Sequence, residues 1–286
     1  MCGKFSLIPS KVQARLVGAC LAALFASSAS AHDFFIMPAK FKVERGAPLM
    51  VDVTIGSSFP GLTNPVPPER IAELRVVGGP QSVFEVEGPG SKSLKTHFKG
   101  DTPGLAILSA RAVAREVEYP EERIAGIMEE YQVEPAAVKA VEALPRPRVL
   151  KALSTRFAKS FVCVERCDGG SDPMRPLGHS VEFIATDASA KSFTLLSKGA
   201  PLANYPVIIA KPDGVRSHLH TSAQGTIDLP GDVSGPMMLF AAVMKPPAEA
   251  GGRFTMDLAS LTLVKNSVGR APGGDQASPG ATDFQS

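Results

Sequence analysis

The sequence contains no tryptophan and only three tyrosines among its 286 residues. Sugar-binding sites usually depend on these rings, so the composition argues against a carbohydrate-binding protein. The sequence also lacks the G-x-S-x-G, H-E-x-x-H and G-x-x-x-x-G-K-[ST] motifs of common enzyme families. Missing motifs alone do not exclude an enzyme, because catalytic groups can assemble from distant positions. We nevertheless expect a protein that is not an enzyme.

Long hydrophobic runs are also missing, since no stretch approaches the roughly 18 uninterrupted apolar residues that a membrane-spanning helix needs. A short apolar run at 16–25 follows three basic residues and precedes the small residues 29–31. This order is typical of a secretory signal peptide. We therefore expect residues 1–31 to be a signal peptide that is cleaved after Ala31. The mature protein would be periplasmic, would begin at His32 and would have no transmembrane segment.

Neither sign of charge dominates the mature chain. The formal charge of the whole sequence is +2, and residues 1–31 carry three basic and no acidic side chains. The 255 residues that follow therefore have a formal charge of −1. Nucleic-acid-binding proteins need clusters of Lys and Arg side chains. The basic side chains of the mature chain are balanced by acidic ones and do not suggest such a cluster. We expect no nucleic-acid partner.

Cysteine is scarce, and only Cys163 and Cys167 follow the expected signal peptide. In an extended strand their Cα atoms would lie about 13 Å apart, whereas a disulfide tolerates less than about 7 Å. A bridge therefore requires the chain to turn between them. Because the expected compartment is oxidising, we favour a disulfide that pins this turn. A redox or metal–thiolate role is the alternative.

Glycine and proline are abundant, with 26 and 25 residues, and they separate short segments in which apolar and polar residues alternate. Strands at this spacing, with turn signals between them, are typical of β-sandwiches. We expect a mainly β protein with two sandwich modules, Ig-like or transthyretin-like. The Gly-, Pro- and Asp-rich stretch 168–178 separates them. The first module would span 32–170 and the second 178–265, with a disordered tail over 266–286.

One segment of the first module has a helical period instead. Ile124, Ile127, Met128 and Tyr131 are spaced to share one face of a helix. A second short helix is expected over 135–143, before two prolines. We predict a two-helix insert at about 120–144.

Several segments in order resemble a known family. They are AHDFFIMP at 31–38, a glycine-bounded strand ending in SFPG at 58–61, the two-helix insert, RFAKS at 156–160, and GAPLAN at 199–204 leading to TSAQG at 221–225. This order is similar to an exported bacterial family of unknown function that is often described as the periplasmic component of cobalt or nickel uptake. The resemblance covers nearly all of 31–264. It implies a β-sandwich body, a C-terminal module similar to transthyretin-like or carboxypeptidase-regulatory-like domains, and an association with metal transport.

Cleavage after Ala31 would give His32 two donors for a metal ion. Its α-amine has a reference pKa of about 7.7–8.0, so it can lose its proton and form a chelate with the imidazole. Nitrogen donors suit copper, nickel, cobalt and zinc. Asp33 and Met37 are nearby extra donors. The alternative is that His32 is merely the residue that follows the cleavage point, with Phe34 and Ile36 starting a strand.

The other histidines are candidate partners for His32. His218 and His220 would share one face of a strand and could hold one metal ion, while Leu219 would point to the core. His97 and His179 complete the set of candidate ligands. The alternative for the His218–His220 pair is two ordinary surface side chains beside a hairpin.

From these patterns we expect a periplasmic transition-metal-binding or uptake-accessory protein that is not an enzyme. Its cofactor or cargo would be a divalent transition metal, and its partner a metal-transport component of the envelope. Nickel or cobalt is favoured by the resemblance alone. The alternative is a metal-free β-sandwich module that binds a protein of the cell envelope.

Overall fold

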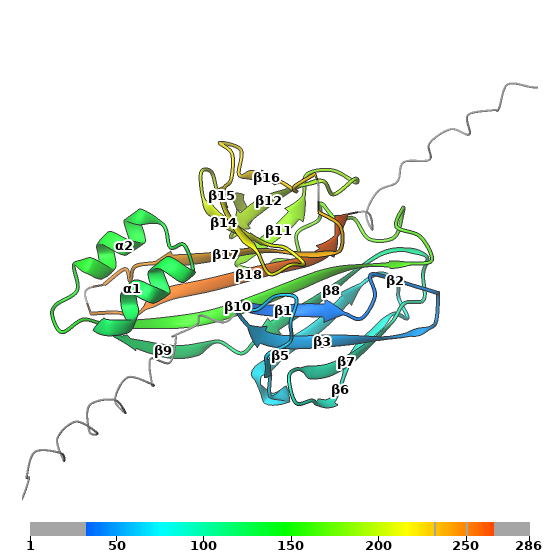
Figure 1. Cartoon of the computed structure of the whole chain (residues 1–286), viewed down its shortest axis with the longest axis horizontal. Coiled ribbons are helices and arrows are strands. Elements are labelled where there is room, and N and C mark those ends of the chain that lie inside the picture. Colours follow the sequence, from blue (N-terminus) through cyan, green and yellow to red (C-terminus); the bar gives the residue numbers. More distant parts are fainter. Residues whose placement is uncertain (1–32, 232, 250, 266–286) are drawn as a thin grey trace, which may run out of the picture.

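The computed structural model describes residues 33–231, 233–249 and 251–265. These residues form three β-sheets and two short α-helices, so the mainly β fold class with a two-helix insert is confirmed (Figure 1). No helix among them is long and apolar enough to cross a membrane. The expected signal peptide, His32 and the expected disordered tail lie outside the described residues.

Sheet A is antiparallel and has the order β1-β3-β7-β6, with β4 paired to β3. Its strands are β1 (Asp33–Pro38), β3 (Pro48–Gly56), β4 (Asn64–Pro65), β6 (Val83–Pro89) and β7 (Leu94–Lys99).

Sheet B has nine strands in the described chain and the order β15-β14-β17-β18-β10-β8-β5, with β2 and β9 also paired to β10. Its strands are β2 (Lys42–Val43), β5 (Ile71–Val77), β8 (Gly104–Ala112), β9 (Arg115–Pro120), β10 (Val149–Val164), β14 (Pro206–Ala210), β15 (Arg216–His220), β17 (Pro236–Lys245) and β18 (Phe254–Val264).

Sheet C is small and antiparallel, with the order β11-β12-β13 and β16 paired to β12. Its strands are β11 (Val181–Ala185), β12 (Ser192–Ser197), β13 (Ala200–Pro201) and β16 (Thr226–Asp228). A 3-10 turn, η1 (Pro68–Arg70), precedes β5, and the helices α1 (Glu121–Glu130) and α2 (Pro135–Glu142) connect β9 to β10.

The helices follow from their sequence. In α1 the buried side chains are Ile124, Ile127 and Met128, which share one face, and two glutamates in the first turn suit the helix dipole. In α2 a proline stands at the first helical position, where no backbone N–H is needed.

The middle of sheet B is covered on both faces, which explains why a central strand such as β17 is a nearly continuous apolar run. Along β17, Met238 and Phe240 belong to the core under the helices, whereas Met237 and Leu239 belong to the core under sheet C. The face of sheet B that carries the helices also packs against sheet A, through β8 and β10. Figure 1 shows sheet B as the central layer.

The two expected sandwiches share this central sheet. β10 lies before the expected boundary at 168–178 and β18 lies after it, yet the two strands pair in parallel from Ala152↔Phe254 to Ser160↔Thr262. Three hydrophobic clusters therefore form on the two faces of one continuous sheet, which is a layer common to both sandwiches.

Candidate functional site

An ion pair fixes the first described residue of β1 against the edge strand β15. Nη1 of Arg216 lies 2.6 Å from Oδ2 of Asp33, and Nη2 lies 3.4 Å from Oδ1. The Asp33 side chain is only 2% exposed. Because Arg216 engages both carboxylate oxygens, Asp33 positions the strand and is poorly placed to act as the additional metal ligand that the sequence suggested.

The two histidines of β15 lie on the same face of the strand as Arg216. Arg216 pairs with Ala210 and His218 pairs with Ile208, and both partners on β14 belong to the core beneath the helices. Directly opposite residues of antiparallel strands point to the same side of the sheet. Arg216, His218 and His220 therefore face the side of sheet B that carries β1 and the helices.

Leu219 corrects one expectation. It points to the opposite face together with Val207, but it is 41% exposed rather than buried in the core. β15 is the edge strand of sheet B, and its two histidines are exposed as well. Because β15 pairs with β14 alone in the described chain, no side chains of a second neighbouring strand pack beside its own.

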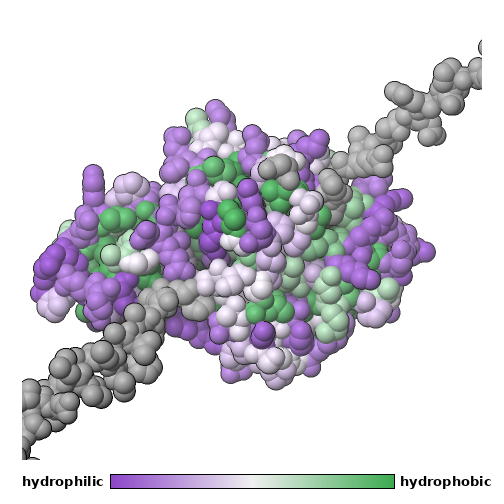
Figure 2. Space-filling view, in the orientation of Figure 1, coloured by the Kyte–Doolittle hydropathy of each residue, from purple (hydrophilic) through white to green (hydrophobic). Residues whose placement is uncertain are grey.

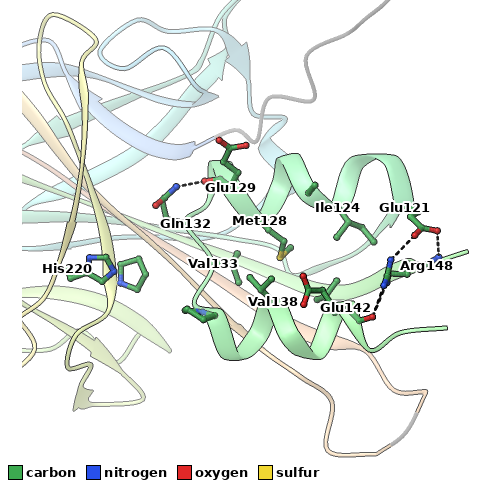
Figure 3. Close-up of a pocket in the computed structure, with 14 residues that line it drawn as sticks. Glu121, Ile124, Met128, Glu129, Gln132, Val133, Val138, Glu142, Arg148 and His220 are labelled. Atoms are coloured by element: carbon green, nitrogen blue, oxygen red, sulfur yellow. Dashed lines mark hydrogen bonds and ion pairs between the residues drawn. The ribbon is translucent and has the colours of Figure 1, made fainter. Parts of the chain in front are cut away.

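His220 also lines a groove between the two helices (Figure 3). The groove has a volume of about 660 Å³. Its apolar lining includes Ile124, Met128, Val133, Val138 and Val141. Figure 2 shows apolar side chains gathered in this region between hydrophilic ones.

The rim of this groove carries charged side chains that are linked by hydrogen bonds. Arg148, the residue before β10, donates to the Glu121 carboxylate at 2.8 Å and to the backbone carbonyl of Glu142 at 2.9 Å, which ties the start of β10 to both helices (Figure 3). The backbone N–H of Arg148 also donates to Oε2 of Glu121 at 3.1 Å. This bond is the largest of the contributions that hold the pKa of Glu121 below its usual value, and the charges and hydrogen bond of the Arg146 and Arg148 side chains add to it.

His97 lies on sheet A and not beside the histidines of β15. Its Nδ1 is 3.6 Å from a carboxylate oxygen of Glu87 on β6. Within the described residues, no three His, Cys, Asp or Glu side chains come together in the manner of a metal site.

His179 is part of a buried polar network instead. Its Nε2 lies 3.1 Å from the Ser109 hydroxyl, and its ring stacks on Phe157 with 4.8 Å between centroids. Burial lowers the pKa of His179 to about 4, although the Glu182 carboxylate opposes this shift. The histidine is therefore neutral at physiological pH.

Glu182 and Lys159 form the centre of this network, and the sequence motifs did not reveal it. Nζ of Lys159 lies 2.8 Å from Oε2 of Glu182, and both side chains are buried. Burial would raise the pKa of Glu182, but Lys159 and the backbone N–H of Leu177 outweigh it and hold the carboxylate ionised. Lys159 and Glu182 each interrupt an otherwise apolar strand segment. This interruption was the one signal in the sequence that could have indicated a buried ion pair. The pair connects β10 to β11 of sheet C.

Cys163 and Cys167 are joined by a disulfide, with their Cα atoms 4.8 Å apart. The chain turns between them at Glu165, whose φ of 58° is in the left-handed region, and Arg166 donates its backbone N–H to Val164 at 2.6 Å. The bridge closes the end of β10 just before the loop that leads to sheet C.

Together these features define a layered β protein with paired histidines on an edge strand and an apolar groove beside them. Residues 29–245 match the family described as "Domain of unknown function (DUF4198)", and the chain belongs to this family. None of the curated proteins matches the chain in sequence. Among solved structures, the chain is similar to the D0-D1 domain of Intimin, with 13% identity and a TM-score of 0.23 over 80% of this chain and 97% of that one.

Proposed function

We propose that the protein is an exported, non-enzymatic binder of a divalent transition metal, with its site where β1 begins. The ion pair between Asp33 and Arg216 is the observation that carries the proposal. Asp33 follows His32 in the sequence, and Arg216 lies two residues before His218 on the same face of β15. The pair therefore brings the residue bonded to His32 next to a strand that presents two imidazoles.

The candidate donors in this site are all nitrogen atoms, which late divalent transition metals prefer. His32 would supply its α-amine and its imidazole once the preceding segment has been cleaved, and His218 would supply a second imidazole. Three nitrogen donors suit nickel, cobalt, copper or zinc. His220, two residues further along β15, is a fourth candidate. Asp33 remains paired with Arg216 and acts on the site by holding β1 in place.

Nickel or cobalt as the metal, and a transport component of the envelope as the partner, extend this proposal. They rest on the resemblance of segments such as 31–38 and 156–160 to the family described above. The exposure of His218 and His220 supports transfer of a metal ion to a partner, because both residues stand exposed on an edge strand. Periplasmic location and cleavage after Ala31 belong to the same proposal.

The test is titration of the exported protein with nickel, cobalt, copper and zinc, after N-terminal sequencing has shown that the chain begins at His32. His32→Ala, and separately one extra residue before His32, should abolish tight binding. His218→Ala should weaken binding at least about tenfold, the effect of losing one good ligand contact. His97→Ala removes an equivalent imidazole on sheet A and is the matched control. Unchanged affinity in both N-terminal variants would contradict the proposal.

A metal-free interaction module is the second candidate, and the groove between α1 and α2 favours it. Apolar side chains line this groove, and glutamates such as Glu129 stand at its rim. An apolar segment with basic residues from an envelope protein would complement it. Failure of all four metals to bind the correctly cleaved protein would favour this candidate.

A further inference from the structure

A second cavity gathers three arginines around a buried hydroxyl. It has a volume of about 220 Å³ and lies between the end of sheet A and the strands β9 and β10. Arg70, Arg115 and Arg156 line it together with Ser154. Apolar side chains, among them Ile55 and Val66, form much of the remaining wall.

The strand register explains why these side chains converge. Ser154 of β10 pairs directly with Arg115 of β9, so both point to the same side of the sheet. Arg156 is two residues along β10 from Ser154 and shares that face. Arg70 approaches from the end of η1, where its backbone carbonyl accepts the N–H of Val113 at 2.8 Å.

The positive charge of this cavity is not neutralised by its own lining, which contains no carboxylate. Within the described chain, the side chains of Arg70 and Arg115 form no ion pair. Arg156 donates to the Tyr131 hydroxyl at 3.5 Å. Arg70 and Arg115 are therefore available to bind an anion, and guanidinium groups are the usual means of holding a carboxylate or another oxyanion.

Ser154 gives an independent indication of a ligand. Its residue is 3% exposed, and its hydroxyl has no hydrogen-bond partner. A buried hydroxyl without a partner is unfavourable, and native proteins rarely leave one. An anion held by the arginines would accept this hydrogen bond.

We propose that this cavity binds a small organic carboxylate with a compact apolar body. The guanidinium groups of Arg70 and Arg115 would bind the carboxylate, the Ser154 hydroxyl would donate to it, and the wall around Ile55 would enclose the apolar part. The cavity is smaller than the roughly 300–1,000 Å³ of pockets for drug-sized ligands, so the ligand has only a few carbon atoms. Inorganic phosphate would match the arginines but not the apolar wall.

The experiment is calorimetric titration of the exported protein with isobutyrate, a branched carboxylate, in a buffer of low ionic strength. Inorganic phosphate is titrated in parallel. We expect isobutyrate to bind and phosphate to bind more weakly. Arg115→Ala and Arg70→Ala should each lower isobutyrate affinity about tenfold or more, because each removes a hydrogen bond to a charged group. Arg123→Ala removes the same charge from the exposed side of α1 and should leave affinity unchanged.

Ser154→Ala separates binding from folding. It should lower isobutyrate affinity about fivefold, the effect of one hydrogen bond. The melting temperature of the ligand-free variant should be unchanged or higher, because the orphaned hydroxyl is gone. The proposal would be overturned by no binding at millimolar isobutyrate, by tighter binding of phosphate, or by equal affinity in the Arg115 and Arg123 variants. Since none of these residues belongs to the proposed metal site, either proposal can fail without the other.

Discussion

Asp33 and Arg216 are 183 residues apart in the chain, yet their side chains meet with 2.6 Å between Oδ2 and Nη1. Arg216 belongs to the edge strand of sheet B, and Asp33 opens the edge strand of sheet A. The pair therefore joins two sheet edges and fixes the beginning of β1. The proposed metal site depends on this relationship.

Arg216→Ala should destabilise the protein by about 3 kcal/mol, because it removes a charged partner that engages both oxygens of the buried Asp33 carboxylate. Arg253→Ala breaks the ion pair between Arg253 and Glu116, in which the two side chains are 51% and 61% exposed. This loss should lower the free energy of unfolding by less than about 1 kcal/mol. The free energy of unfolding in urea measures both. Equal losses in the two variants would show that the Asp33–Arg216 pair has no special structural role.

Metal affinity should fall steeply as the pH is lowered below about 8, because the α-amine of His32 must lose its proton before it can bind a metal ion. Below the pKa of that amine, each pH unit should weaken binding about tenfold. Competition with a chelator of known affinity at pH 6, 7 and 8 measures the change. An affinity that does not depend on pH would argue against the amine as a ligand.

The folded protein should lose stability as the pH falls from 6.5 towards 4, the range between the ordinary and the lowered pKa of His179. Burial favours the neutral imidazole, so protonation favours the unfolded state, in which the pKa is ordinary. The loss should reach at most about 3 kcal/mol at pH 4. His179→Gln keeps a polar group beside Ser109 and should flatten the pH dependence between pH 6.5 and 4.5. A slope identical to that of the unchanged protein would contradict this assignment.

Loss of the disulfide should destabilise the protein moderately. Cys163→Ala with Cys167→Ala removes a bridge that closes a very short loop, for which chain entropy predicts about 2 kcal/mol. The melting temperatures of the unchanged protein with and without reductant, and of the double variant, measure this effect. The melting temperature of the double variant should be the same with and without reductant. A large effect of reductant on the variant would show that other chemistry is involved.

Local patterns in the sequence predicted the elements well. The 3.6-residue spacing of Ile124, Ile127 and Met128 identified α1, because one buried face of a helix leaves a clear periodic signal. Alternation identified most strands, because their side chains face two different surroundings. The turn at Glu165 followed from the distance that a disulfide can span.

Long-range pairing could not be predicted in this way. Nothing in the composition of β10 indicates that Ala152 pairs with Phe254 across the expected boundary. The convergence of Arg70 and Arg115 could not be predicted either, since both residues look like ordinary surface arginines in the sequence. Leu219 was placed in the core because alternation gives the face of a strand but not whether the strand lies at an edge.

The shared central sheet also determines when the fold can be completed. β18 is the last strand of the described chain, and it covers the long open edge of β10 from Ala152 to Ser160. Until residue 262 has emerged during synthesis, that edge keeps unpaired N–H and C=O groups, which other chains can bind. A chain truncated before Phe254 would therefore aggregate rather than leave a folded N-terminal half.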